Sequence, residues 1–313
     1  MKKAVVLMNM GGPNNLDEVE VFLKNMFNDK YIIGAPQPIR ALIAFLIISM
    51  RKNEAKNNYK LLGGISPIVG HTKRLVRRLE KRLENIDVFY EMRYTPPFAK
   101  EIVTNLKDYD RVFAIPMYPH YSSTTTKSSI EDFRKYAKKA NLKAEIRTVD
   151  YYYYNTSYNK AIVERIKEAL KDDNSEDFEL IFSAHGLTQR TIDKGDPYQE
   201  HILKNVECAK KELKSQNINF KNIHVAYQSR VGPMEWLRPY LEDKLEEIKK
   251  SKKVLIYPIS FTVDNSETEF ELDIEYKEVA ENHGFIDYRV AKVANHNSYF
   301  LDTLEEIITS LDI

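Results

Sequence analysis

Three carboxylates recur at every fourth position near residue 270: Glu267, Glu271 and Glu275. On a helix this spacing places them along one ridge, because four residues turn the chain only about 40° past a full turn. Like charges at this spacing weaken an isolated helix by about 0.2–0.5 kcal/mol per pair. The same pattern places Phe270 and Ile274 on one side of the ridge and Leu272 and Val279 on the other. The face opposite the ridge is more solvated and carries Tyr276, Glu269 and Asp273. We therefore expect an inward ridge that conducts cations or protons.

A capped surface helix is a second interpretation of the same segment. Charge runs on helices are usually solvated faces. Asp264 with Glu267, or Ser266 with Glu269, also has the spacing of a capping box. Both interpretations stay open on this segment alone.

His185 closes an apolar run and precedes Gly186. A histidine placed this way is often a hydrogen-bonded core residue, but a neutral imidazole in a partly apolar cleft is also a good proton acceptor and metal ligand. Gly186 would let a large ligand approach the backbone. Trp236, at an expected helix start, is either a core anchor or a flat wall for a planar ligand. The pattern places three other histidines at the surface: His71, His201 and His283.

The composition describes an ordinary globular protein. Of 313 residues, 43% are hydrophobic and 30% charged, and the net charge of +1 provides no field to attract nucleic acid. The single cysteine, Cys208, excludes a disulfide framework, a CxxC zinc site and a cysteine-ligated iron–sulfur cluster within one chain. This usage is typical of a reducing compartment such as the cytoplasm. The apolar start of the chain is too brief for a signal peptide and is expected to be a buried strand.

Short apolar runs alternate with longer helical patterns, which predicts right-handed βαβ units and parallel sheets. Eight strands suit one barrel or two doubly wound domains, and no internal repeat or linker marks a boundary. The expected strands are 4–10, 87–93, 112–118, 143–149, 178–184, 223–228, 254–261 and 288–293. The expected helices are 72–83, 128–140, 157–170, 200–213, 235–249, 266–281 and 298–311.

Unusual polar motifs follow several of these strands. They are residues 9–13, 92–94, 118–126, 183–186 and 227–233. Ligands of open α/β sheets bind at the carboxyl ends of the strands, so the motifs indicate one shared crevice. The sequence has no Gly-x-Gly-x-x-Gly after the first strand, no Gly-Lys-Ser/Thr loop and no Gly-x-Ser-x-Gly elbow. These absences argue against a dinucleotide site, a P-loop and a serine hydrolase.

The run Ala41–Met50 is apolar nearly all round and is flanked by Arg40 and Arg51. It is too short to cross a bilayer, which takes about 20 apolar residues. A buried core helix is one interpretation. An interfacial helix that dips into a membrane is the other.

The motifs together closely resemble those of ferrochelatases. The match covers Phe182–Leu187, Tyr227–Pro233 with Trp236-Leu237, Phe261–Asp264 with Glu267-Thr268, and Asp273–Tyr276. It also covers residues 7–13, 63–67, 92–94 with Pro97-Phe98, and 118–122, in the family's order. The resemblance implies two Rossmann-like domains with a porphyrin cleft between them, here 1–125 plus 296–313, and 126–295.

The resemblance also implies an activity and roles for matching residues. Ferrous iron would be inserted into a porphyrin to make haem, as a substrate and with no tightly bound cofactor. His185 would take pyrrole protons or receive the metal, and Glu267 would lie across the ring from it. A proton or metal path would run through Glu271, Glu275 and Asp264. The porphyrin would be lined by Met10, Arg93, Tyr94, Ser122, Trp236 and Phe261. The run 41–50 lies where the family has a cleft lip that can touch membrane.

The chain departs from the family pattern at several positions. Asn265 stands where many relatives have histidine, His120 replaces a glutamine and Thr188 a proline. Met10 is the residue of protoporphyrin enzymes, whereas coproporphyrin enzymes commonly have tyrosine, which favours protoporphyrin IX. The alternatives are a coproporphyrin III ferrochelatase, a cobalt or nickel chelatase for another tetrapyrrole, and a non-catalytic haem or porphyrin carrier with His185 as axial ligand.

Overall fold

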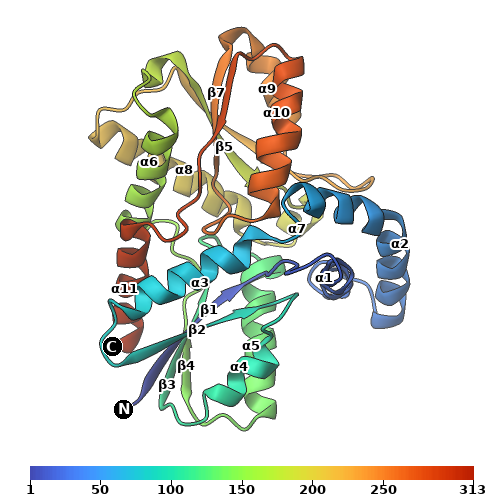
Figure 1. Ribbon diagram of the computed structural model, residues 1–313, viewed down its shortest axis with the longest axis vertical. Helices are drawn as coiled ribbons and strands as arrows, with labels where there is room; N and C mark the ends of the chain where they lie inside the picture. Colours follow the sequence, from blue (N-terminus) through green and yellow to red (C-terminus); the bar gives the residue numbers. More distant parts are fainter. The chain divides into compact units, whose positions relative to one another are not determined.

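A computed structural model describes residues 1–313, which form two compact units. The first unit comprises Met1–Tyr118, Ser122–Asp150 and Leu304–Ile313, and the second comprises Pro119–Tyr121 and Tyr151–Thr303. Each unit contains a four-stranded parallel sheet flanked by helices, as Figure 1 shows. The predicted α/β fold with two doubly wound sheets is confirmed.

The sheet of the first unit has the strand order β2-β1-β3-β4. Its strands are β1 (Lys3–Asn9), β2 (Ile86–Met92), β3 (Arg111–Pro116) and β4 (Glu145–Thr148). Its helices are α1 (Glu18–Phe27), α2 (Gln37–Leu61), α3 (Pro67–Glu80), α4 (Ala99–Asn105), the π-turn η1 (Ser123–Lys127) and α5 (Ser128–Lys139). Alternate side chains of β1, such as Val6 and Met8, pack against Val103 of α4 and Phe133 of α5.

The sheet of the second unit has the order β6-β5-β7-β8, the same pattern as the first. Its strands are β5 (Glu179–His185), β6 (Asn222–Gln228), β7 (Lys253–Pro258) and β8 (Asp287–Val290). Its helices are α6 (Thr156–Leu170), η2 (Ser175–Asp177), α7 (Gln189–Asp193), α8 (Tyr198–Ser215), α9 (Leu241–Ile248), η3 (Lys249–Ser251), the π-helix η4 (Glu267–Glu275) and α10 (Tyr276–Asn282). In both sheets the strand order reverses beside the first strand, where ligand sites of such folds are found.

The division between the units differs from the prediction. We expected it at residue 125, but β4 completes the first sheet and α5 packs against it, so the first unit extends to Asp150. The expected helix 235–249 begins only at Leu241, because residues 229–240 form a loop that contains Pro233 and Pro239. Three helices carried too weak a pattern to be predicted: α1, α4 and α7.

The helix α11 (Ser298–Asp312) carries the chain back to the first unit. Lys3 of β1 pairs with Asp312 at 2.5 Å, and Arg111 Nη1 of β3 lies 2.7 Å from an Asp312 carboxylate oxygen. Arg147 Nη1 of β4 donates to the Leu311 carbonyl at 2.6 Å. Cations on three strands of the first sheet therefore meet the end of this helix, where the helix dipole favours positive charge.

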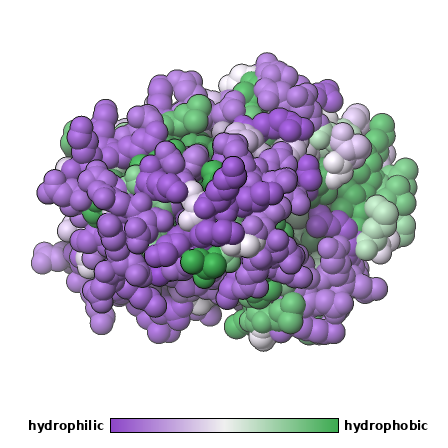
Figure 2. All heavy atoms as spheres, turned by 90° about the horizontal axis from the view of Figure 1, so that it is seen from above, coloured by the Kyte–Doolittle hydropathy of each residue, from purple (hydrophilic) through white to green (hydrophobic).

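Helix α2 keeps much of its apolar surface in contact with solvent. Six large side chains are at least half exposed: Ile39, Leu42, Phe45, Leu46, Met50 and Leu61. Figure 2 shows apolar residues gathered on the side of the molecule where Figure 1 draws α2. The interpretation of residues 41–50 as a buried core helix is therefore wrong, and the partly exposed apolar helix is confirmed. No helix of the structure combines the length and the apolar character needed to cross a bilayer.

Strand β2 contains a fully buried carboxyl group, Glu91. Burial raises its pKa from 4.5 to about 8, and the nearby charge of Asp132 acts in the same direction. Because the pKa is higher in the folded protein, the stability this group contributes is complete below about pH 4.5 and is lost as the pH rises through about 8. We expect the free energy of unfolding to fall by on the order of a few kcal/mol across this range.

The variant Glu91→Gln cannot ionise and should show a much flatter dependence, measured by urea unfolding at pH 5, 6.5 and 8. Glu84→Gln, at an exposed position before the same strand, serves as the control. Equal slopes in Glu91→Gln and the parent protein would rule out Glu91 as the origin of the pH dependence.

Candidate active site

His185 is the last residue of β5, and its surroundings fix the imidazole. Its Nδ1 lies 2.7 Å from the Gly186 carbonyl oxygen, which can only accept a hydrogen bond. Nδ1 therefore carries the proton in the neutral ring, and Nε2 keeps a free lone pair. The backbone is held too, because the His185 N–H donates to Ser260 Oγ at 2.9 Å and the Tyr198 hydroxyl donates to the His185 carbonyl at 2.9 Å. The ring is positioned as a proton acceptor or a metal ligand through Nε2.

Glu267 faces that lone pair. Its Oε2 lies 3.6 Å from His185 Nε2, and the two side chains are 24% and 33% exposed. Ligand atoms bonded to one transition-metal ion at about 2.1 Å each lie roughly this far apart. A porphyrin between the two groups would need about 7 Å, one van der Waals contact on each face. In this structure His185 and Glu267 are therefore closer together than a porphyrin between them would need, and their placement across the ring stays a prediction.

The acidic segment is a π-helix and not the α-helix that the spacing predicted. The Tyr276 N–H donates to the Glu271 carbonyl five residues earlier, the pattern that defines this wider helix. The ridge of three glutamates runs from the part-buried Glu267 and Glu271 to the exposed Glu275. Phe270 and Leu272 are buried beside it as expected. Ile274 is 41% exposed and Tyr276 packs on the core of the second unit, so these two positions were predicted wrongly.

Glu271 is held at the centre of the ridge by two donors on one oxygen. Ser229 Oγ donates to Glu271 Oε2 at 2.5 Å, and Gln228 Nε2 donates to the same atom at 3.2 Å. Burial, together with the charge of Glu267, raises the pKa of Glu271 to about 7 against the opposing effect of the two donors. The carboxyl group therefore exchanges a proton near neutral pH, which a group on a proton path must do.

Asn265, which replaces a histidine of the family pattern, is a buried cap for this helix. Its Oδ1 accepts the Glu267 N–H at 2.8 Å, and its Nδ2 donates to the Val263 carbonyl at 3.2 Å. Both atoms of the amide are engaged, and an amide does not act as a base near neutral pH. His185 is thus the histidine next to Glu267, with no second base at position 265.

Asp264 was predicted on the acidic path, and its carboxylate is 1% exposed and held by several donors. Asn295 Nδ2 donates to it at 2.6 Å and Thr268 Oγ1 at 3.0 Å. These contacts tie the start of η4 to the loop after β8. A role in metal or proton transfer stays a prediction for this residue.

Gly186 is needed for packing within the site. A Cβ at this position would lie 2.8 Å from the Gln228 carbonyl oxygen and 3.3 Å from the Trp236 ring. Trp236 lies in the loop before α9, where its Nε1 donates to the Val231 carbonyl at 3.1 Å. The space beside Gly186 is therefore filled by protein, not left for a ligand as predicted. Phe261, after β7, meets the His185 ring edge to face at 6.5 Å.

The remaining predicted porphyrin contacts belong to the first unit. Met10 and Arg93 directly follow β1 and β2 and are partly exposed. Tyr94 is 4% exposed and packs in a cluster with Phe22 of α1 and Tyr59 of α2. Ser122 is 1% exposed, and its Oγ accepts the Thr124 N–H at 3.2 Å at the start of η1. Tyr94 and Ser122 thus have structural contacts that the sequence did not indicate.

Four side chains of the site were given no role from the sequence. Gln228 and Ser229 lie in the polar motif 227–233. Their hydrogen bonds to Glu271 depend on the conformation of the loop after β6, which the sequence did not indicate. Ser229 has a φ of 66°, a left-handed conformation that costs a non-glycine residue free energy and that is common at functional sites. Ser260 and Tyr198 hold the His185 backbone from two other elements, and no short-range pattern marks them.

His201, expected at the surface, is buried beside Tyr151 and Tyr153.

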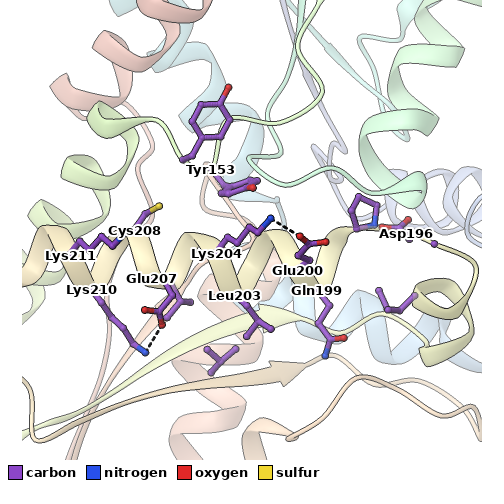
Figure 3. A pocket seen from close by; sticks show the side chains of 16 residues that line it. Tyr153, Asp196, Gln199, Glu200, Leu203, Lys204, Glu207, Cys208, Lys210 and Lys211 are labelled. Carbon is purple, nitrogen blue, oxygen red and sulfur yellow. Dashed lines mark hydrogen bonds and ion pairs between the residues drawn. The ribbon is translucent and has the colours of Figure 1, made fainter.

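One cavity of the second unit lies elsewhere, along α8. It measures about 860 Å³ and is lined mainly by residues of that helix, shown in Figure 3. Lys204 pairs with Glu200 at 2.5 Å and Lys210 with Glu207 at 2.8 Å, the two contacts drawn dashed in Figure 3. The charged groups that line the cavity thus neutralise one another along α8. No predicted site residue lines the cavity. We therefore keep His185 and the acidic ridge as the candidate site.

Comparison with known proteins identifies the family of the chain. The ferrochelatase family model matches residues 2–311. A ferrochelatase of Sulfurimonas denitrificans is 50% identical over 99% of both chains, and one of Helicobacter pylori is 39% identical over 99% of this chain and 93% of its own. Among solved structures, SirB from Bacillus subtilis with Fe3+ has a TM-score of 0.61 at 8% identity, covering 99% of this chain and 96% of its own.

CbiX, the terminal enzyme for biosynthesis of siroheme in denitrifying bacteria, has a TM-score of 0.54 at 10% identity, with 98% of each chain covered. These two likenesses concern the fold alone. The family match and the identity to ferrochelatases over nearly the whole chain go further. The chain belongs to the ferrochelatase family, the metal chelatases of the lyase class that use porphyrin and ferrous iron in haem biosynthesis.

Proposed function

We propose that the protein inserts ferrous iron into protoporphyrin IX, with His185 and Glu267 binding the metal and receiving protons. The observation that supports this most is the free Nε2 lone pair of His185 facing a Glu267 carboxylate oxygen at 3.6 Å. A neutral imidazole and a carboxylate are both suitable ligands for a divalent transition metal. The pair is half-buried, so a metal bound there would lose part of its water shell.

The reaction exchanges one Fe2+ for two pyrrole protons, so the site must remove both. In our proposal His185 accepts a pyrrole proton at Nε2, and the protons leave along the acidic ridge. Glu271 is suited to the middle of this path because its pKa of about 7 lets it take up and release a proton near neutral pH. Glu275 is exposed and ends the ridge in solvent.

In this proposal the porphyrin contacts are those that the family resemblance implies, Met10, Arg93, Phe261 and Trp236. Met10 supports protoporphyrin, because the family resemblance connects a thioether at this position with protoporphyrin enzymes. Rigid aromatic walls would also bend the ring and expose its nitrogen lone pairs, which favours the transition state for metal insertion.

An anaerobic assay with ferrous iron tests the proposal directly. The parent protein should convert many equivalents of protoporphyrin IX, followed by loss of porphyrin fluorescence. A single equivalent of bound porphyrin without turnover would instead indicate a carrier. Faster conversion of coproporphyrin III would overturn the substrate assignment, and faster insertion of cobalt or nickel would overturn the metal assignment.

We further propose that α2 makes a weak, reversible contact with membranes. Leu42, Phe45 and Leu46 expose more than half of their surface, and Arg40 and Arg51 flank them. An apolar helix surface with basic flanks suits a membrane interface that includes anionic lipids. Protoporphyrin dissolves poorly in water, so uptake from a membrane surface would help the reaction.

The double variant Leu42→Ser/Phe45→Ser should reduce co-sedimentation with vesicles of phosphatidylcholine and phosphatidylglycerol. Its thermal stability should stay close to that of the parent protein, because both side chains already face solvent. Leu203→Ser on α8 replaces a leucine that is 47% exposed and is the matched control. The membrane proposal fails if the parent protein does not sediment with these vesicles at low salt.

A further inference from the structure

A buried carboxylate, Asp29, joins three parts of the first unit. It follows α1, and its side chain is 1% exposed. Its Oδ2 accepts from Arg93 Nη2 at 2.9 Å, from the Tyr94 hydroxyl at 3.1 Å and from the Ser128 hydroxyl of α5. Its Oδ1 accepts the Tyr31 N–H at 2.9 Å. Four donors on one carboxylate make Asp29 the fixed point around which these groups are arranged.

Each nitrogen of the Arg93 guanidinium group lies beside an acceptor. Besides Asp29, its Nε donates to Ser128 Oγ at 3.0 Å, and its Nη1 lies 3.6 Å from Asp132 Oδ2. The side chains of Arg93 and Asp132 are only 20% and 14% exposed. One cation is thus enclosed by two carboxylates, and burial keeps water from screening them fully.

Other charges nearby do not free the arginine. Glu91 lies close enough to act on Arg93, but a carboxyl group can add no positive charge to this cluster. Lys135 lies 3.9 Å from Asp132, is itself 55% exposed and is screened by solvent. Asp29 and Asp132 already neutralise the positive charge of Arg93. They would therefore repel a ligand carboxylate that approached it. The exposed part of Arg93 is therefore a flat, rigid surface and not an anion clamp.

We propose that Asp29 and Asp132 act through Arg93 as specificity-determining residues that make this wall accept an uncharged edge of the porphyrin and reject a carboxylate. The inference rests on the proposed function, in which Arg93 lines the porphyrin site. Protoporphyrin IX has its two propionates on one edge and vinyl groups on the other, whereas coproporphyrin III has propionates on both edges. The charge arrangement thus discriminates between these two substrates by repulsion, in addition to shape.

The test compares kcat/KM for protoporphyrin IX and coproporphyrin III in the parent protein, Asp29→Asn and Asp132→Asn. Each variant keeps the side-chain shape but removes one negative charge beside Arg93. The ratio of the coproporphyrin value to the protoporphyrin value should rise about tenfold in each, as expected when one partly screened like charge is removed. Asp87→Asn, at the opposite end of β2 where Asp87 accepts the Tyr109 hydroxyl, should leave the ratio unchanged.

A second set of variants separates this effect from loss of structure. If Asp29→Asn fails to fold, Asp132→Asn tests the same charge effect with one ion pair lost. In an Arg93→Met background, Asp132→Asn should no longer change the ratio, because the group through which it acts is absent. The inference is wrong if both asparagine variants keep the parent ratio, or if the parent protein prefers coproporphyrin III. If the parent protein metallates no porphyrin, the proposed function itself fails.

Discussion

Replacing His185 with alanine is expected to abolish metal insertion while the protein stays folded. The variant loses the Nε2 lone pair that faces Glu267, and loss of a positioned base typically lowers a rate by about 10²–10⁴. Porphyrin binding should persist, because the aromatic and apolar walls are untouched. Single-turnover kinetics under anaerobic conditions, with porphyrin fluorescence quenching for binding, measure the two effects separately.

His224→Ala is the matched control for this experiment. His224 lies on the neighbouring strand β6 and pairs with Glu179, the first residue of β5, at 2.9 Å. The control removes a histidine from the same sheet at the end away from the site, so it should lose some stability and keep its rate. Near-parental turnover in a folded His185→Ala protein would refute the assignment of His185.

The three carboxylates of the ridge should differ in their effects. Glu267→Gln should lower turnover most, by about 10- to 100-fold or more, because it removes the proposed metal ligand beside His185. Glu271→Gln should have a smaller effect at pH 8 but should change the pH profile. The parent rate should rise as the pH passes about 7 and Glu271 ionises, and this rise should be absent from the variant. Glu275→Gln, at the exposed end, should change the rate least.

None of the three substitutions should destabilise the protein much. The cap of η4 comes from Asn265, and removing a charge relieves repulsion along the ridge. Glu278→Gln, at an exposed position of α10, controls for the loss of a negative charge near the helix. A silent Glu267→Gln variant that loses about 1 kcal/mol of stability would support the capped surface helix instead.

The strands could be predicted well from the sequence because burial leaves a strong local pattern. All eight expected strands exist, each displaced by a few residues at most, since runs such as 4–8 in β1 are apolar and bounded by polar motifs. The placement of His185 at a strand end followed from the same pattern. Helices with a one-sided pattern, such as α5 and α6, were also found within one or two residues.

The parts that failed depend on contacts between distant segments. The π-helix η4 cannot be told from an α-helix by spacing, because one extra residue in a turn leaves no compositional mark. The geometry of His185 and Glu267 depends on how the loops after β5 and β7 approach each other, which no local pattern records. The shared strand order of the two sheets has no counterpart in an internal repeat, because hydrophobic pattern and not residue identity determines it.

The return of α11 to the first sheet has a consequence for the order of events during synthesis. Lys3, Arg111 and Arg147 emerge from the ribosome early, but their partners at residues 311 and 312 follow after the whole second unit. The unit that starts first is therefore the one that is completed last. During translation Lys3, Arg111 and Arg147 lack these partners until α11 has been synthesised. A chaperone or another part of the nascent chain would be needed to cover these basic residues in the meantime. The second unit needs no such wait, because its strands and their covering helices lie in one stretch of the chain from Tyr151 to Thr303.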